Sequence, residues 1–132
     1  MRPEDKLQKQ VAEILDMGGL VWSATANGAF LNGDAKQRAI RGMRMKEHGV
    51  KNGLPDCLIF DKFFIHYQDE ERMGANRNGL AIELKVGKNK PTPAQLKWHE
   101  DLRRCGWRVD VCYNIDEVLK VLRECYPSKF PE

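Results

Sequence analysis

Two short stretches of the sequence place acidic and basic side chains against apolar segments. In "NGLPDCLIFD" (52–61), Asp56 ends a polar loop and leads directly into an apolar run, and "GLAIELKVGK" (79–88) carries Glu83 and Lys85 inside another. If the two runs are neighbouring strands, Asp56 approaches Glu83, and adjacent carboxylates raise each other's pKa unless a cation lies between them. Carboxylate oxygens suit Mg²⁺ or Mn²⁺. The pattern therefore indicates a metal site for phosphodiester hydrolysis, in which Lys85 balances developing negative charge.

The segment 80–86 has a plainer interpretation when it is taken alone. Alternate side chains of a strand share a face, so the large apolar residues form one face and Ala81, Glu83 and Lys85 form the other. An amphipathic strand with Glu83 and Lys85 in water satisfies this pattern, and E-x-K by itself is a weak motif. Asp56 favours the site instead, because a turn delivers it to the start of the preceding strand.

The elements that must position these residues follow from apolar periodicity and turn signals. Helices are predicted over 3–17, 34–47, 92–106 and 114–125, and strands over 20–24, 57–60, 63–67, 80–86 and 107–113. Asp34 is the expected N-cap of the second helix, and Thr92 and Gln95 can form a capping box at the start of the third. This order predicts an α/β fold with a central mixed sheet flanked by helices.

Composition fits one domain over 1–132. At 42% hydrophobic and 31% charged residues, the chain can bury a core, and its net charge of +3 is compatible with nucleic acid. The segment 68–79 is polar and lacks periodicity, which predicts a long hairpin loop, and the tail 126–132 is expected to be loose. No apolar run approaches the ~18 residues of a membrane span, and the first ten residues lack a signal-peptide core. We therefore expect a cytoplasmic protein.

The four cysteines predict free thiols. None forms a C-x-x-C pair, and two of them, Cys57 and Cys112, lie inside apolar strand-like runs, which favours reduced, buried thiols over a disulfide framework or a zinc site. The three histidines also lack the spacing of zinc ligands.

The predicted helix 34–47 carries a basic stripe. Arg38, Arg41 and Arg44 recur at every third position, away from the apolar side at Ile40 and Met43. Such a stripe is either a solvated helix face or a surface that contacts DNA phosphates.

Further motifs carry a resemblance over most of the chain. The sequence contains "PD", then 26 residues and "E-x-K", and this spacing resembles the PD-(D/E)-x-K nuclease superfamily. The other motifs are "EDKLQ" (4–8), "TANGA" (25–29, with Ala26 where proline is usual), "HGVKNGLPD" (48–56) and "TPAQLKWHEDLRRCGWRVDV" (92–111). Together they resemble the virus-type replication–repair nuclease domain, VRR-NUC, in its stand-alone phage form. The resemblance implies a restriction-endonuclease-like core.

The resemblance also implies roles at the site. Asp56 and Glu83 would ligate the metal together with the backbone carbonyl of Leu84, and Lys85 would be the catalytic lysine. Gln95 would lie beside the metal, although its capping box with Thr92 explains it without catalysis.

A further glutamate from the first helix is expected at the site, and helical phase chooses between two candidates. Glu4 shares a side with Leu7 and Val11, toward the sheet, whereas Glu13 points away. We therefore expect Glu4 as a further catalytic and metal-binding residue. A favourable charge in the helix's first turn is the plainer explanation.

Other residues are expected near the substrate. Asn27 would shape a loop beside it, and Lys88 and Lys90 would contact phosphates unless they are ordinary solvated lysines. Trp98 fits the core better than a base-stacking platform.

These features predict a Mg²⁺/Mn²⁺-dependent deoxyribonuclease, and the resemblance implies that it cuts branched DNA, such as Holliday junctions or flaps. A homodimer is expected, because two-fold pairing presents two sites in matching orientation, and "FFIHY" (63–67) is the expected interface. The alternative is a catalytically inactive DNA-binding protein of the same fold.

Overall fold

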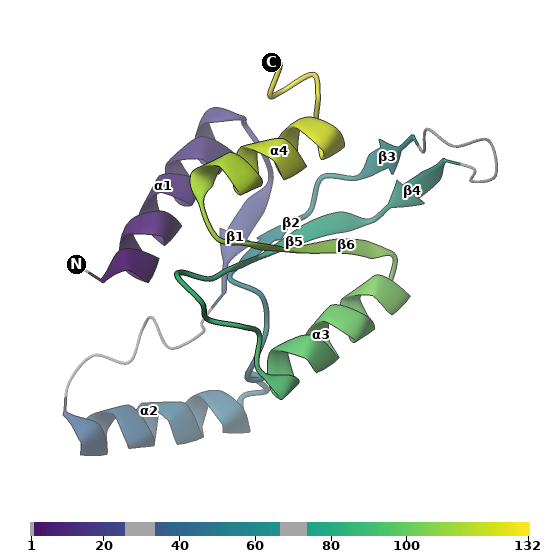
Figure 1. The fold of residues 1–132 in the computed structure, drawn as a ribbon. Helices are drawn as coiled ribbons and strands as arrows, with labels where there is room; N and C mark the ends of the chain where they lie inside the picture. The colour runs from purple at the N-terminus through teal and green to yellow at the C-terminus, as the bar shows by residue number, and fades with distance from the viewer. Residues whose placement is uncertain (1, 26–33, 67–73) are drawn as a thin grey trace.

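A computed structural model describes residues 2–25, 34–66 and 74–132 (Figure 1). Four described strands form the main sheet in the order β1-β2-β5-β6, and two more pair as a separate ribbon, β3-β4. The elements in chain order are α1 (Pro3–Met17), β1 (Trp22–Ala24), α2 (Ala35–Glu47), β2 (Cys57–Ile59), β3 (Phe63–Ile65), β4 (Ala75–Arg77), β5 (Gly79–Leu84), α3 (Pro93–Arg104), β6 (Trp107–Cys112) and α4 (Ile115–Cys125).

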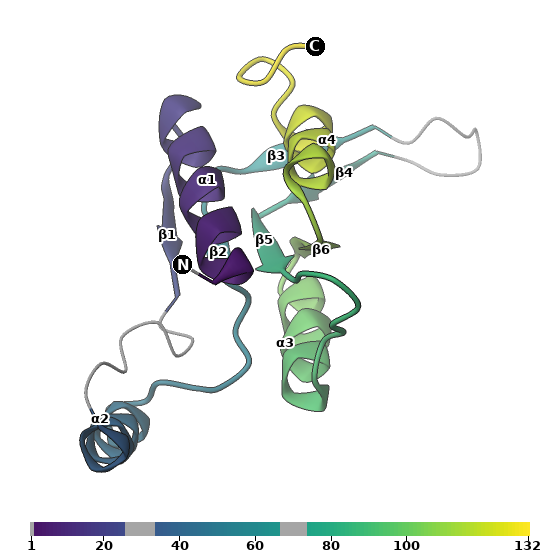
Figure 2. The ribbon, with the colours of Figure 1, turned by 60° about the vertical axis from the view of Figure 1, so that its left-hand side comes forward.

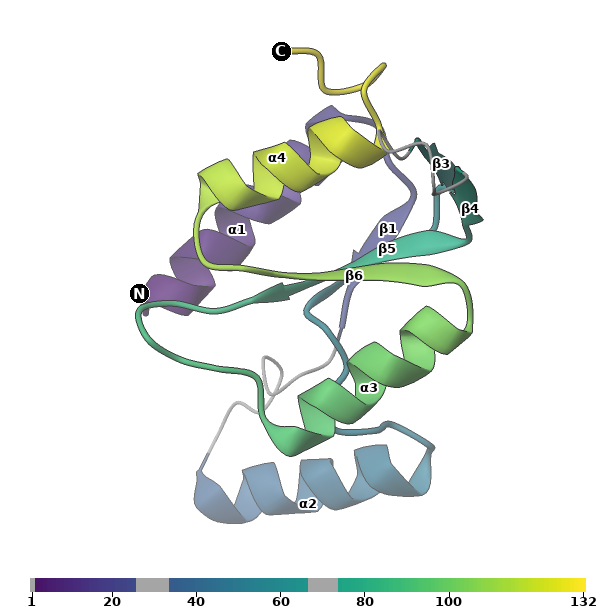
Figure 3. The same ribbon diagram turned by 45° about the vertical axis from the view of Figure 1, so that its right-hand side comes forward.

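The main sheet is mixed. β1 pairs antiparallel with β2, β2 antiparallel with β5, and β5 parallel with β6. The parallel pair requires a crossover connection, which α3 supplies. Helices α1 and α4 lie on one face of the sheet and α3 on the other (Figure 3). The predicted fold, a central mixed sheet flanked by helices, is confirmed.

The apolar core lies between the sheet and the α1–α4 layer. Helix α1 buries Leu7, Val11 and Leu15 on one stripe, which is the phase expected from the sequence. From β5, Leu80 and Ile82 are fully buried in the same cluster. The even-numbered residues of β5 therefore face α1 and α4, and the odd-numbered residues face α3.

Local signals set the helix boundaries as predicted. The Asp34 side chain accepts a hydrogen bond from the Gln37 amide and Gln37 bonds back, so α2 begins with a capping box. Thr92 and Gln95 form the same motif at the start of α3. Such caps satisfy amide groups that the first helical turn leaves without partners.

Two predictions about connecting segments need correction. Part of the expected loop 68–79 is a strand, because β4 pairs with β3 in antiparallel register; its sequence, "ANR", has no alternation that would predict a strand. The tail is not loose throughout, since Tyr126 is 5% exposed. Tyr126 packs edge-on against Phe63 and donates a hydrogen bond to the Asp61 carbonyl at 2.8 Å.

The cysteine prediction holds in part. Cys57, Cys112 and Cys125 are free and buried, whereas Cys105 is free and exposed. None of the helices in the described part of the chain is long and apolar enough to cross a bilayer.

Candidate active site

Strand pairing brings Asp56 and Glu83 together. The antiparallel register sets Cys57 opposite Ile82, so Asp56, one residue earlier, lies level with Glu83, one residue later. The Asp56 carboxylate Oδ2 accepts a hydrogen bond from the Leu84 amide at 2.7 Å, which fixes it at the end of β5. The predicted neighbourhood of the two acidic residues is confirmed.

The two carboxyl groups perturb each other. Glu83 is only 1% exposed, and burial raises its pKa to about 8, with the charge of Asp56 and a hydrogen bond between the two side chains acting in the same direction. Burial also raises the pKa of Asp56, although the Leu84 amide opposes this. In the absence of a cation, the pair therefore holds a proton well above the usual range for carboxyl groups.

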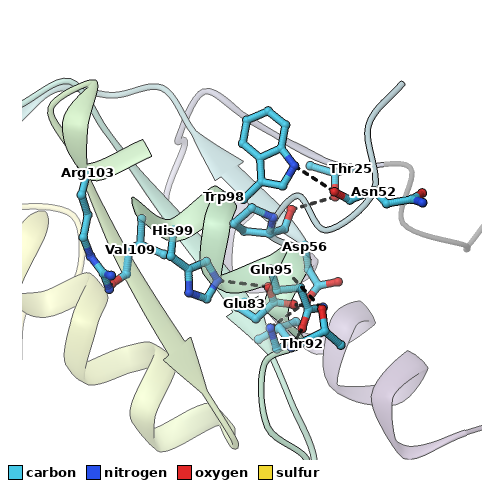
Figure 4. A network of polar contacts seen from close by, with 12 residues as sticks. Thr25, Asn52, Asp56, Glu83, Thr92, Gln95, Trp98, His99, Arg103 and Val109 are labelled. Carbon is cyan, nitrogen blue, oxygen red and sulfur yellow. Dashed lines mark hydrogen bonds and ion pairs between the residues drawn. The ribbon is translucent and has the colours of Figure 1, made fainter. Parts of the chain in front are cut away.

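Helix α3 holds the Glu83 carboxylate at both oxygens (Figure 4). Gln95 Nε2 donates to Oε2 at 3.2 Å, and His99 Nε2 lies 3.3 Å from Oε1. The side-chain oxygen of Gln95, Oε1, accepts a hydrogen bond from the Thr92 backbone amide at 2.8 Å. Gln95 therefore caps the helix with one end of its side-chain amide and contacts Glu83 with the other.

His99 is a site residue that the sequence reasoning missed. It is 2% exposed, and its pKa is lowered by burial first and then by the positive charges of Arg103 and Lys85. The spacing of the three histidines indicates only that they do not form a zinc site. The available signal was different: His99 follows Gln95 by four residues, so both project from the same face of a helix.

Lys85 lies one residue beyond the last residue of β5, on the same side of the sheet as Glu83. Its amide bonds to the Cys112 carbonyl at 3.0 Å, which continues the pairing with β6. Its side chain is buried, at 9% exposure, and its charge lowers the pKa of both Asp56 and Glu83. The plainer interpretation, in which Glu83 and Lys85 lie in water, is wrong because α3 covers this face.

Glu4 lies near the site without joining the carboxylate pair. It is exposed in the first turn of α1, and its charge raises the pKa of both Asp56 and Glu83. Within the described residues, no three His, Cys, Asp or Glu side chains lie close enough to hold one metal ion. One turn further along α1, Gln8 contacts the Cys57 thiol at 3.5 Å.

The loop that ends at Asp56 is tied to its surroundings. Trp98 is half-buried and donates from Nε1 to the Asn52 carbonyl at 2.9 Å, so it anchors this loop rather than filling the core. Gly53 has φ +89°, and a Cβ there would lie 2.8 Å from the Ala94 carbonyl carbon. Thr25 reaches the same loop, donating from Oγ1 to the Pro55 carbonyl at 2.7 Å.

The expected DNA-contacting residues that the structure describes lie outside this cluster. Helix α2, with Arg38, Arg41 and Arg44, has no buried residue and lies apart from the sheet (Figure 2). Lys88 and Lys90 are exposed between β5 and α3. Asn27 lies outside the described residues.

Comparison with known proteins supports the fold. No protein-family model matches the sequence, and no curated protein is similar to it. Among solved structures, the chain is similar to a "VRR_NUC domain protein", with a TM-score of 0.65 and 23% identity over 96% of this chain and 90% of that one. At this identity the likeness is one of fold. It agrees with the VRR-NUC resemblance of the motifs and with a restriction-endonuclease-like core.

Proposed function

We propose that this protein is a metal-dependent endonuclease of the VRR-NUC type that hydrolyses phosphodiester bonds in DNA. The observation that carries the proposal is the close pair of carboxyl groups, buried Glu83 and half-buried Asp56, with buried Lys85 on the same side of the sheet. Burying charged groups is costly unless a partner compensates them. A fold similar to that of a VRR_NUC domain protein supports a nuclease as the reason for the arrangement.

The residues present fit a hard divalent cation. Asp56 and Glu83 offer carboxylate oxygens, the Leu84 carbonyl is a third candidate ligand, and Glu4 contributes negative charge from nearby. Oxygen donors without thiolate or imidazole ligands favour Mg²⁺ or Mn²⁺. A cation between the carboxylates would also relieve the repulsion that raises the pKa of Glu83. Such an ion, when bound, polarises a phosphate and lowers the pKa of a bound water.

The other residues of the site and of helix α2 are proposed to stabilise charge, orient Glu83 and bind DNA. Lys85 lies beside both carboxylates and would stabilise negative charge on the scissile phosphate. Gln95 orients Glu83 through its amide nitrogen at 3.2 Å. Arg38, Arg41 and Arg44 of the exposed helix α2, together with Lys88, Lys90 and Asn27, would contact the DNA backbone.

Branched DNA is the proposed substrate and a homodimer the proposed assembly. A four-way junction has two symmetric strands to cut, and a two-fold dimer would present two sites in matching orientation. The expected interface includes β3, whose two faces differ in exposure. Phe63 on one face is 8% exposed and packs against Tyr126, whereas Phe64 on the other face is 41% exposed. The Phe64 side is therefore the proposed contact. Light scattering coupled to size exclusion, with Phe64→Ser as the test variant, measures the oligomer directly.

A catalytically inactive DNA-binding protein of this fold is the competing possibility. A protein that only binds DNA gains nothing from a buried glutamate, a half-buried aspartate and a buried lysine held together, because these groups raise the cost of folding. Helix α2 alone would supply affinity for phosphates.

Cleavage of defined DNA tests the proposal. Purified protein is incubated with linear duplex, flap and four-way junction DNA in Mg²⁺, Mn²⁺, Ca²⁺ or EDTA. We expect cleavage in Mg²⁺ and Mn²⁺, none in EDTA, and preference for branched substrates. Binding without cleavage in every metal would support the inactive DNA-binding protein. Equal cleavage of all three substrates would refute the preference for branched DNA but not the nuclease activity.

A further inference from the structure

We propose that His99 is a positioning residue of the metal site: its imidazole donates a hydrogen bond from Nε2 to Glu83 Oε1 and holds that carboxylate in its ligating orientation. The inference rests on the proposed function, because it assigns His99 a role in binding the metal that the nuclease needs. It goes further in assigning a role to a residue that the motifs leave unexplained.

The geometry is that of a two-point clamp. Glu83 Oε1 lies 3.3 Å from His99 Nε2, and Glu83 Oε2 accepts from Gln95 Nε2 at 3.2 Å. The two clamping residues are four apart on α3, so one helix face supplies both contacts. Each carboxylate oxygen has two lone pairs, so one on each oxygen stays available for a cation on the Asp56 side. Removing either contact would free the carboxylate to rotate.

The direction of the hydrogen bond follows from the chemistry of its partners. An ionised carboxylate only accepts hydrogen bonds, and a neutral imidazole has one N–H, so Nε2 must carry the proton when Glu83 is a metal ligand. The ring is 2% exposed, so Glu83 rather than water is the partner of Nε2.

A plainer role for His99 is to fill space between α3 and the sheet. The two roles make different demands on a substitute. Filling space needs volume only, so Leu would serve. Positioning needs a donor at the place of Nε2, and the amide nitrogen of Gln supplies one. His99→Leu and His99→Gln therefore form a matched pair of variants.

The experiment measures Mn²⁺ affinity, separately from cleavage. Free Mn²⁺ is counted by its electron paramagnetic resonance signal as protein is added, for the wild type and both variants. Outer-shell hydrogen bonds to metal ligands are typically worth 10–100-fold in affinity. We expect His99→Leu to weaken Mn²⁺ binding by roughly tenfold or more, and His99→Gln to recover most of the loss. The metal concentration needed for half-maximal cleavage should shift in parallel.

The outcomes separate this inference from the proposed function. Wild-type affinity in both variants, or an equal loss in both, would overturn the positioning role while the wild type still binds Mn²⁺ and cuts DNA. A wild type that neither binds Mn²⁺ nor cuts DNA would instead refute the proposed function.

A second measurement needs no variant, in case His99→Leu fails to fold. Nitrogen-15 NMR of the wild-type ring with Mg²⁺ present reports which ring nitrogen carries the proton. Protonated Nε2 supports the inference, and a ring protonated only at Nδ1 overturns it.

Discussion

Strand β5 and helix α2 both carry charged side chains, but in opposite environments. All six residues of β5 are buried, Glu83 among them, and Lys85 beyond its end is buried as well. None of the thirteen residues of α2 is buried. Five of these are basic and only Glu47 is acidic; the basic residues are Lys36, Arg38, Arg41, Arg44 and Lys46.

The difference assigns two roles to two regions: the buried region suits catalysis, and the exposed helix suits electrostatic attraction of DNA. A charge in the interior needs hydrogen bonds or a counter-charge, and Glu83 has contacts with Gln95, His99 and Asp56. A charge on a solvated helix needs no such support, and it can attract phosphates over about one Debye length. The buried region can therefore fix atoms for a reaction, whereas the exposed region can only hold a polyanion nearby.

The largest expected effect comes from the buried region. Asp56→Asn removes one carboxylate charge and Lys85→Met removes the ammonium group while keeping a buried apolar stem. Removing one group that stabilises charge in a transition state costs about 10²–10³ in rate, and loss of a proposed metal ligand should cost at least that. We expect each variant to lose cleavage by roughly a thousandfold or more, as measured under single-turnover conditions on the preferred substrate.

DNA binding in Ca²⁺ is the control for these two variants. Both should bind within a few-fold of the wild type, because the basic helix is untouched. Full cleavage by either variant would contradict the assignment of Asp56 and Lys85 to the active site.

The next effect comes from the exposed region. Replacing Arg38, Arg41 and Arg44 by alanine should leave folding unchanged, because none of the three is buried. Each phosphate contact contributes about 0.9 to the slope of log affinity against log salt concentration. We expect the slope to fall by up to about three units, while the rate of cleavage by the bound enzyme stays near that of the wild type.

A matched triple variant on the opposite face of the sheet provides the control. Lys120, Arg123 and Lys129 are exposed on α4 and the tail, and their replacement by alanine removes the same charge. An equal loss of salt dependence in both triple variants would show that net charge, and not α2, accounts for the affinity.

A smaller effect is expected on the pH dependence of stability, which tests the raised pKa of Glu83. Without metal, the folded protein keeps the Glu83 proton up to a pKa of about 8, whereas the ordinary value is 4.5. Between these values the folded state binds more protons than the unfolded chain, so this group makes the free energy of unfolding fall as pH rises, by at most about 1.4 kcal/mol per pH unit. His99, whose pKa is lowered, contributes the opposite slope near its own ordinary value.

Comparison with Glu83→Gln isolates the glutamate. In EDTA, urea unfolding of the wild type should lose stability over this pH range relative to the variant, which has no titrating group at position 83. Saturating Mn²⁺ should remove the loss in the wild type, since a bound cation replaces the proton. Parallel pH profiles for the two proteins in EDTA would contradict the raised pKa of Glu83.

The two regions also differ in how far the sequence predicts them. Alternation in 80–86 predicted the two faces of β5, because these depend on local periodicity. The pairing of β5 with β2 was only assumed, and given that pairing the position of Asp56 predicted its approach to Glu83. Burial of Glu83 and Lys85 was not predictable in the same way, since it depends on α3 packing over their face. The spacing of four residues from Gln95 places His99 on the same helix face, but only the tertiary contact shows that this face lies over Glu83. Strand β4 was missed because a three-residue polar strand has no pattern of its own.

The smallest expected effect lies in the loop that joins the two regions. This loop runs from α2 to Asp56, and Trp98 anchors it through the Asn52 carbonyl at 2.9 Å. Trp98→Phe keeps an aromatic ring but removes the hydrogen-bond donor, which should lower the free energy of unfolding by about 1 kcal/mol. Trp22 offers a control, because its Nε1 donates to Asp16 Oδ1 at 2.8 Å away from the site. If the loop bond positions Asp56, Trp98→Phe should slow cleavage several-fold more than Trp22→Phe at a similar loss of thermal stability. Equal cleavage by the two variants would mean that the Asn52 bond contributes to stability alone, and that β5 and α3 hold the site without help from the chain that leads to the basic helix.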